Sequence, residues 1–287
     1  MRAVFRHELS SSFTGMTAYV FTAFLLLFAG IYTMAYNISG RLANFEYVFS
    51  AMNFIFLIIV PVLTMRSLAE EKRQRTDQLL YSLPLNMTKV VMGKYAAMLV
   101  VLQLPSGIIS IYPIILSAFG NVYLPGAFGA LIGFFFLGAA LIAVGMFVSS
   151  LTESQALAAG LCFVLLLVNY FLSSLAGFVS TTAWASFVAF SLLLVLLALL
   201  LRYMTGSSLL AGGAFVLTES LLFALYLFRQ DSFQGLFPAL LRQLSLFARF
   251  ESFVNGVFDL GALVYFSTVA GFFLFLSVQS MEKRRWS

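Results

Sequence analysis

The sequence predicts an all-α fold, a polytopic bundle of transmembrane helices with both termini in the cytoplasm, and three observations support this. The composition is 62% hydrophobic and 9% charged, whereas soluble domains carry about 25% charged residues. Uncharged runs long enough to cross a bilayer as helices recur along the whole chain. The basic residues are shared unequally between alternate loops, and this asymmetry sets the orientation.

The first element, residues 1–16, is predicted to be an amphipathic helix. Its apolar residues recur at helical spacing, while Arg2, Arg6 and Ser10 form a polar stripe. Such a helix lies along the cytoplasmic membrane surface before the chain enters the bilayer; a solvated or partly buried loop helix is the alternative. The apolar run that follows is too long for a cleavable signal and lacks a small-residue cleavage site.

Eight apolar segments are predicted to span the membrane: Ala18–Tyr36, Tyr47–Met65, Tyr95–Phe119, Ala127–Val148, Ala156–Val179, Ala183–Leu201, Leu209–Phe228 and Leu260–Val278. With a cytoplasmic N-terminus, only four of the 16 basic residues fall outside, namely Arg41, Arg229, Arg242 and Arg249. The other 12 fall inside, so the positive-inside rule places both termini in the cytoplasm. These charges serve topology and contacts with anionic membrane lipid, and nucleic acid is not an expected partner.

Residues 66–94 form the largest predicted cytoplasmic element and contain EEKRQRTDQLLYSLP. Thr76 is placed to cap a short helix that Pro84 ends, and Asn86 is placed to cap the next helix. The apolar edge of the short helix consists of Leu79, Leu80 and Leu83. Two interpretations remain open from spacing alone: a prong that presses into a groove on another protein, or a plain loop with basic topology anchors.

A second amphipathic segment precedes the last span, in FPALLRQLSLFARFES. Pro238 suits a first helical turn, and apolar and basic or hydroxyl side chains then occupy opposite faces. This range, 236–256, is predicted to form one helix at or dipping into the outer membrane face. A loop helix is again the alternative.

Polar residues within the predicted spans are few. Glu219 is the only acidic residue deep inside one, so it is expected to have a partner or to be protonated. It contributes either to a polar substrate path or to a hydrogen bond between neighbouring helices. Gln103 is a second candidate for the path. The single histidine, His7, and single cysteine, Cys162, leave no His or Cys metal cluster, so neither a metal site nor a catalytic site is expected.

The charged segment EEKRQRTDQLLYSLPLNMTKVVMGK resembles the cytoplasmic segment of ABC-2 type transporter permeases. The N-terminal RHELSSSFTGMTAYVF is similar to that family's opening. The C-terminal LSLFARFESFVNGVFDLGALVYFSTVAGFFLFLSVQSMEKRRW is most similar to the gliding-motility and nitrous-oxide-accessory subfamily. The resemblance covers the first half of the chain and its end.

The resemblance implies a role for each part of a single permease domain, 1–287. Residues 1–16 would be the elbow helix, 66–94 the coupling segment and 236–256 an extracellular re-entrant helix. Contact with an ATPase would involve Glu70, Glu71, Arg73, Thr76, Leu79, Leu80, Leu83 and Pro84. The family usually has six spans, so 183–228 would be an inserted pair. Arg75 stands where the family usually has glycine.

The resemblance also implies the partners and the function. The sequence has no G-x-x-x-x-G-K-[ST] loop, so ATP and Mg²⁺ would bind separate ATPase subunits and this chain would bind no cofactor. A second permease subunit and an accessory extracytoplasmic protein are further expected partners. The expected function is an ABC exporter permease, multi-pass in the bacterial cytoplasmic membrane. Two alternatives remain: a non-transporting subunit of such a complex, and an ion-coupled carrier.

Overall fold

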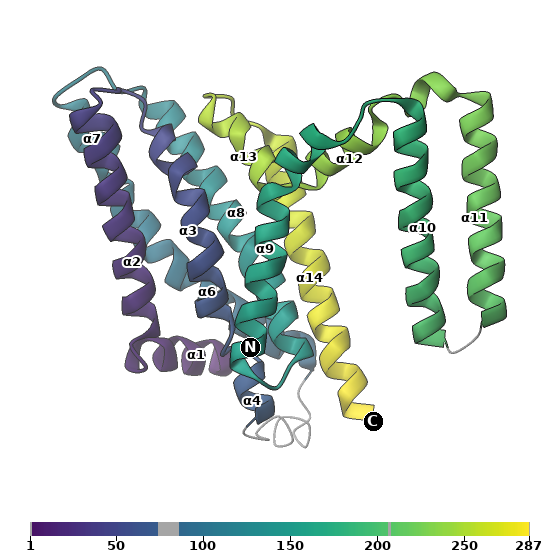
Figure 1. Cartoon of the computed structure of the whole chain (residues 1–287). Helices are drawn as coiled ribbons and strands as arrows, with labels where there is room; N and C mark the ends of the chain where they lie inside the picture. The colour runs from purple at the N-terminus through teal and green to yellow at the C-terminus, as the bar shows by residue number, and fades with distance from the viewer. Residues whose placement is uncertain (1, 74–85, 206–207, 287) are drawn as a thin grey trace. The chain divides into compact units, whose positions relative to one another are not determined.

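The computed structural model describes residues 2–73, 86–205 and 208–286. Within these ranges every regular element is a helix (Figure 1). The polytopic all-α prediction is therefore confirmed. Five of the predicted coupling residues lie outside the described ranges: Thr76, Leu79, Leu80, Leu83 and Pro84.

The helices follow the predicted apolar segments closely. Their bounds are α1 Arg2–Thr14, α2 Thr17–Tyr32, η1 Thr33–Ser39, α3 Glu46–Thr64, α4 Ala69–Arg73, α6 Met87–Ile109, α7 Ile111–Ser117, α8 Leu124–Leu151, α9 Gln155–Phe178, α10 Ala183–Thr205, α11 Ser208–Phe228, η2 Gln230–Phe233, α12 Leu236–Leu244, α13 Leu246–Val254 and α14 Leu260–Trp286.

Six helical stretches among the described residues are long and apolar enough to cross a membrane: Thr17–Ser39, Glu46–Thr64, Met87–Ser117, Leu124–Leu151, Gln155–Phe178 and Leu260–Lys283. A further stretch, α11 with the helices after it, is bent by 113° and brings the count to seven if it is one span. The predicted count of eight is larger because it takes α10 and α11 as two full spans. The apolar stretch of α10 is shorter, Ala183–Leu199.

The chain divides into two compact units by its internal contacts. The first comprises Met1–Val168 and Arg249–Ser287, and the second comprises Asn169–Ala248. The predicted organisation as one permease domain stays a prediction.

In the first unit, α8 is the central helix and packs against α3, α6 and α14. Aromatic side chains fill the space between α3 and α8, where the rings of Phe56 and Phe134 stack with centroids 4.4 Å apart. Small residues allow this close approach. A Cβ atom at Gly145 would lie 2.3 Å from the hydroxyl oxygen of Thr64, so glycine is required for α8 and α3 to meet there.

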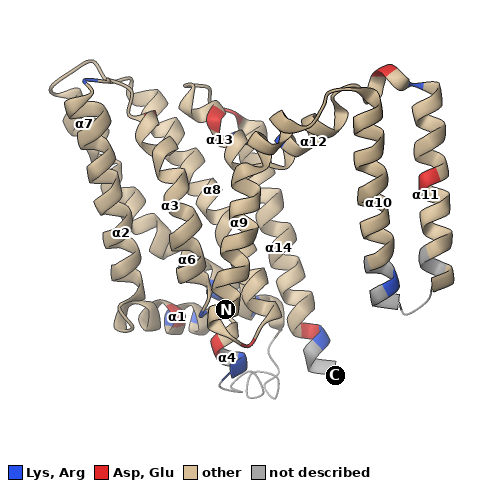
Figure 2. Cartoon of the chain, viewed as in Figure 1, with Lys and Arg blue, Asp and Glu red and all other residues tan. Residues whose placement is uncertain are grey.

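Both ends of the chain lie at the same end of the first unit, together with α1 and α4 (Figure 1). Figure 2 shows several ribbon positions of Lys and Arg at this end. The shared location agrees with the predicted topology, in which both termini and residues 66–94 lie on the cytoplasmic side.

In the second unit, α10 and α11 pack against each other. An aromatic cluster joins them near η2: the ring of Tyr226 lies 4.9 Å from that of Phe187 and 5.6 Å from that of Phe233. The rings hold the hairpin together through edge and offset contacts.

The predicted single helix over 236–256 is wrong in one respect, because the structure breaks it at Ser245 into α12 and α13. The Asn169 side chain accepts a hydrogen bond from the Leu246 amide at 3.0 Å and donates one to the Leu244 carbonyl at 3.1 Å. The Ser245 hydroxyl accepts from the Ala248 amide at 3.2 Å and so caps α13. These bonds satisfy the backbone groups that a break exposes.

Candidate functional site

The candidate site is the region where the predicted coupling segment leaves and re-enters the helical bundle. Glu70, Glu71 and Arg73 lie on the short helix α4, the first part of the segment that the structure describes. The Arg73 side chain is exposed, whereas Lys72 beside it is buried.

The start of α4 is fixed to the end of α8 by one buried hydroxyl. The Ser149 Oγ atom accepts hydrogen bonds from the amides of Leu68 and Ala69, at 3.2 and 3.0 Å. The same hydroxyl donates to the Met65 carbonyl at 3.3 Å. The first amides of a helix have no partner within it, so a hydroxyl of α8 takes the place of a local cap.

A second contact joins α4, α8 and α14 at a single carbonyl. The Lys72 ammonium donates to the Ser150 carbonyl oxygen, and the Ser280 hydroxyl of α14 donates to the same oxygen at 3.1 Å. The last carbonyls of α8 lack partners within the helix, and a cation is favoured at that end of the helix dipole. The segment is therefore held to α8, and α14 bonds to the same α8 carbonyl.

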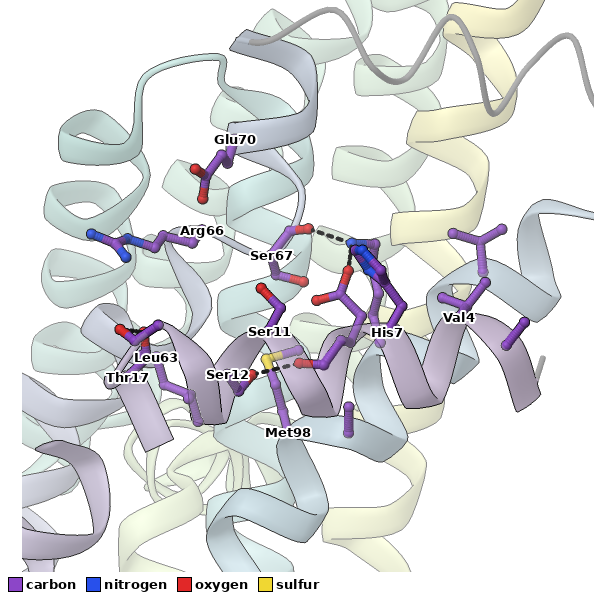
Figure 3. Close-up of a pocket in the computed structure, with 16 residues that line it drawn as sticks. Val4, His7, Ser11, Ser12, Thr17, Leu63, Arg66, Ser67, Glu70 and Met98 are labelled. Carbon is purple, nitrogen blue, oxygen red and sulfur yellow. Dashed lines mark hydrogen bonds and ion pairs between the residues drawn. The ribbon is translucent and has the colours of Figure 1, made fainter. Parts of the chain in front are cut away.

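The return of the segment into the bundle is fixed as well. The Asn86 side chain accepts from the Thr88 amide at 3.0 Å, which confirms the predicted cap of α6. Two turns later Lys94, only 2% exposed, forms an ion pair with Glu8 of α1. The same ammonium donates to the Ser67 carbonyl at 3.0 Å (Figure 3).

A cavity of about 630 Å³ lies beside this ion pair, between α1, the end of α3, α4 and the start of α6. Its walls include His7, Glu8, Ser67, Glu70 and Lys94. Figure 3 shows His7, Ser67 and Glu70 among the side chains that line it.

Both described ends of the segment are held by polar contacts. Each end includes one charge-assisted bond, from Lys72 to the Ser150 carbonyl of α8 and from Lys94 to Glu8 of α1, and such bonds are stronger than neutral ones. The segment is thus joined to α8 at its start, and to α1 through Lys94 of α6 at its return.

A family model described as ABC-2 family transporter protein matches residues 2–278 of the chain. The chain belongs to this family. No curated protein and no solved structure matches it. Family membership, with the six or seven apolar helices, makes the chain a multi-pass membrane subunit of an ABC transporter, which works with ABC ATPase subunits.

Glu219 lies between two helices of this ABC-2 protein. Its Oε1 atom accepts a hydrogen bond from the Ser191 hydroxyl at 2.6 Å, joining α11 to α10. This geometry matches the interhelical alternative considered for Glu219 in the sequence. Gln103 is exposed on α6. The substrate-path role of both residues stays a prediction.

Sequence reasoning missed most of the residues that hold the segment in place. Lys94 was counted only as a topology charge, although it interrupts an apolar stretch of α6, and a buried lysine needs a partner. Glu8, Ser149 and Ser280 lie far from it in sequence, so no local pattern joins them.

A buried acid at the far end of α3 was also missed. Glu46 is the first residue of α3 and is 3% exposed, and its Oε2 atom has no hydrogen-bond partner among the described residues. It stands one residue before the predicted span, so the sequence placed it in the loop.

Proposed function

We propose that this chain is the permease subunit of an ABC exporter, and that residues 66–94 couple ATP hydrolysis on separate subunits to movement of the spans. One observation supports this above the others: polar bonds tie the described start of the segment to α8, and tie Lys94 at its other end to Glu8 of α1 and to the Ser67 carbonyl. A plain interhelical loop has no need of such anchors.

The coupling would operate through contacts that differ between two packed arrangements of the spans. A ligand shifts such an equilibrium only by its differential affinity for the two states. ATP binding to the partner subunits would favour one position of the segment, and α8 and α14 would follow through Ser149, Lys72 and Ser280.

The chemistry of ATP would belong to the partner. The printed sequence contains no phosphate-binding loop of the G-x-x-x-x-G-K-[ST] type. ATP and Mg²⁺ would be held by the ATPase subunits, and a pair of permease subunits would meet a pair of ATPases.

The closer likeness to gliding-motility and nitrous-oxide-accessory permeases rests on the C-terminal sequence alone. The family model does not support this subfamily. Export is likewise proposed from the resemblance to ABC-2 permeases. In the alternative, a non-transporting subunit, ATP coupling would be intact but no substrate would cross the membrane.

The test is a double substitution in the predicted leucine edge, Leu79→Asp with Leu80→Asp. A charged edge would not enter an apolar groove, so we expect the ATPase to be lost on co-purification or its coupled activity to fall at least tenfold. The control is Leu209→Asp, an exposed leucine at the predicted cytoplasmic end of α11. Unchanged coupling in the double variant would refute the proposal.

A further inference from the structure

A second cavity, of about 330 Å³, adjoins the polar one and has a different character. It is a groove between the first turns of α2 and the last turns of α3. Its lining is almost wholly apolar and includes Val20, Phe21, Phe24, Ile58 and Val62. From Thr17 to Phe24 it extends about 10 Å along α2, at 1.5 Å per residue.

The two cavities share part of their lining. Gly15, Thr17, Leu63 and Arg66 line both of them, so the apolar groove opens at its cytoplasmic end into the polar cavity. By the predicted topology the groove lies at the depth of the cytoplasmic leaflet, because α2 enters the membrane from that side.

Arg66 stands at the junction of the two cavities. Its side chain is exposed and makes no hydrogen bond or ion pair with any other residue that the structure describes. Figure 3 shows it extending away from His7 and Ser67. The neighbouring cation, Lys94, is by contrast paired with Glu8. The guanidinium is thus available for a ligand at the level of the lipid headgroups.

We propose that this two-part site binds a glycerophospholipid of the cytoplasmic leaflet, with its phosphate on Arg66 and one acyl chain in the α2–α3 groove. A guanidinium matches a phosphate geometrically by bidentate hydrogen bonding. The Ser11 hydroxyl in the polar cavity offers a further donor to the headgroup. The acyl chain leaves one apolar environment for another, so the headgroup contact determines which lipid is retained.

The wall also contains two carboxylates, Glu8 and Glu70. Glu8 is neutralised by Lys94, and Glu70 lies one helical turn beyond Arg66 and has a partner of its own. Charge complementarity with the phosphate therefore centres on Arg66.

The test counts lipids that remain bound when the full chain is purified with palmitoyl-oleoyl phosphatidylglycerol and examined by native mass spectrometry. Wild type should retain one such lipid per chain. Arg66→Gln should lower the occupancy about fivefold, which corresponds to about 1 kcal/mol per basic residue at an anionic surface. Val62→Trp, at a position 41% exposed, should fill the groove and remove the lipid.

Matched variants separate this site from general lipid adhesion. Arg73→Gln removes another exposed cation outside both cavities, and Ile31→Trp enlarges an exposed α2 side chain outside the groove. Neither should change the occupancy. Size-exclusion profiles and melting temperatures should show that all four variants are folded.

Three results would overturn the proposal. Equal occupancy in Arg66→Gln would show that the phosphate is not held there, and equal occupancy in Val62→Trp would show that the groove is not used. Complete displacement of the phospholipid by soluble glycerol phosphate would identify a small-anion site and not a lipid site; retention of the lipid against it supports the proposal.

Discussion

The Lys94–Glu8 ion pair shows how single residues join segments of the chain that are distant in sequence. Lys94 lies on the inner face of α6 and Glu8 on α1, and their bond is supplemented by the Ser67 carbonyl. An ammonium this buried is stable only with such partners, because charge is costly to remove from water.

Replacing this lysine should weaken the whole cytoplasmic end. Lys94→Met removes the ammonium and leaves the Ser67 carbonyl without its donor, and hydrogen bonds to charged groups contribute about 1.5–3 kcal/mol each. We expect a lower melting temperature in detergent and loosening of α1. Lys89→Met, at an exposed position on the same helix, is the control. Equal melting temperatures for the two variants would contradict a structural role for the pair.

A glycine of α8 gives a second prediction at this scale. At Gly145 an added Cβ would meet the buried Thr64 side chain at 2.3 Å, whereas at Gly160 of α9 nothing lies within 4 Å. Gly145→Ala should therefore destabilise the protein by about 1–3 kcal/mol through overpacking. Gly160→Ala should be neutral or favourable, since alanine is the better helix former. Thermal unfolding of the two variants side by side provides the comparison, and the reverse order would be evidence against the α3–α8 contact.

Among the elements, α4 is a short helix whose start is capped from a helix distant in sequence. The Ser149 hydroxyl accepts hydrogen bonds from two amides at the start of α4, and the Lys72 ammonium donates one to the Ser150 carbonyl. These contacts fix the start of the segment to the end of α8.

The anchor can be tested without touching the proposed ATPase contact. Ser149→Ala leaves the amides of Leu68 and Ala69 without their acceptor, and an unsatisfied buried group costs about 1–3 kcal/mol. We expect faster amide hydrogen exchange over residues 66–73 and weaker ATP coupling, with ATPase binding retained.

The matched control is Ser150→Ala. The Ser150 hydroxyl donates only to the Phe147 carbonyl of its own helix, at 2.7 Å, while Lys72 uses the Ser150 backbone carbonyl, which alanine keeps. Exchange over 66–73 should stay at the wild-type rate. If both serine variants exchange alike, Ser149 is not the anchor.

The sequence predicted the elements well where the evidence for them was local. The length of the apolar runs predicted α2, α3, α8 and α14, and Asn86 predicted the start of α6. Both kinds of prediction depend only on residues that are neighbours in the sequence. The break at Ser245 was missed because Asn169, which stabilises it, is far away along the chain.

The candidate site was harder to predict, because most of its contacts join residues that are distant in sequence. Glu70, Glu71 and Arg73 were named because their charged segment resembles the coupling segment of ABC-2 permeases. The anchors that hold them, Ser149 and Ser280, are ordinary hydroxyl residues within apolar runs. Only the packing of α8 and α14 brings them beside α4.

At the scale of the whole molecule, the proposal requires one topology. Both termini, α1 and α4 share one end of the first unit, and 12 of the 16 basic residues belong to the predicted cytoplasmic side. The segment 66–94 must then face the compartment that holds ATP.

The most direct measurement is site-directed labelling and cross-linking of a single cysteine, Leu80→Cys, in a Cys162→Ala background. Alanine replaces the buried natural cysteine, so the introduced thiol is the only one in the sequence. The new thiol is expected to react with impermeant reagent only in inverted membrane vesicles, and to cross-link to the ATPase in the assembled, nucleotide-loaded complex. Labelling from the outside of intact cells, or a thiol that stays freely reactive in the loaded complex, would contradict the coupling role of this segment.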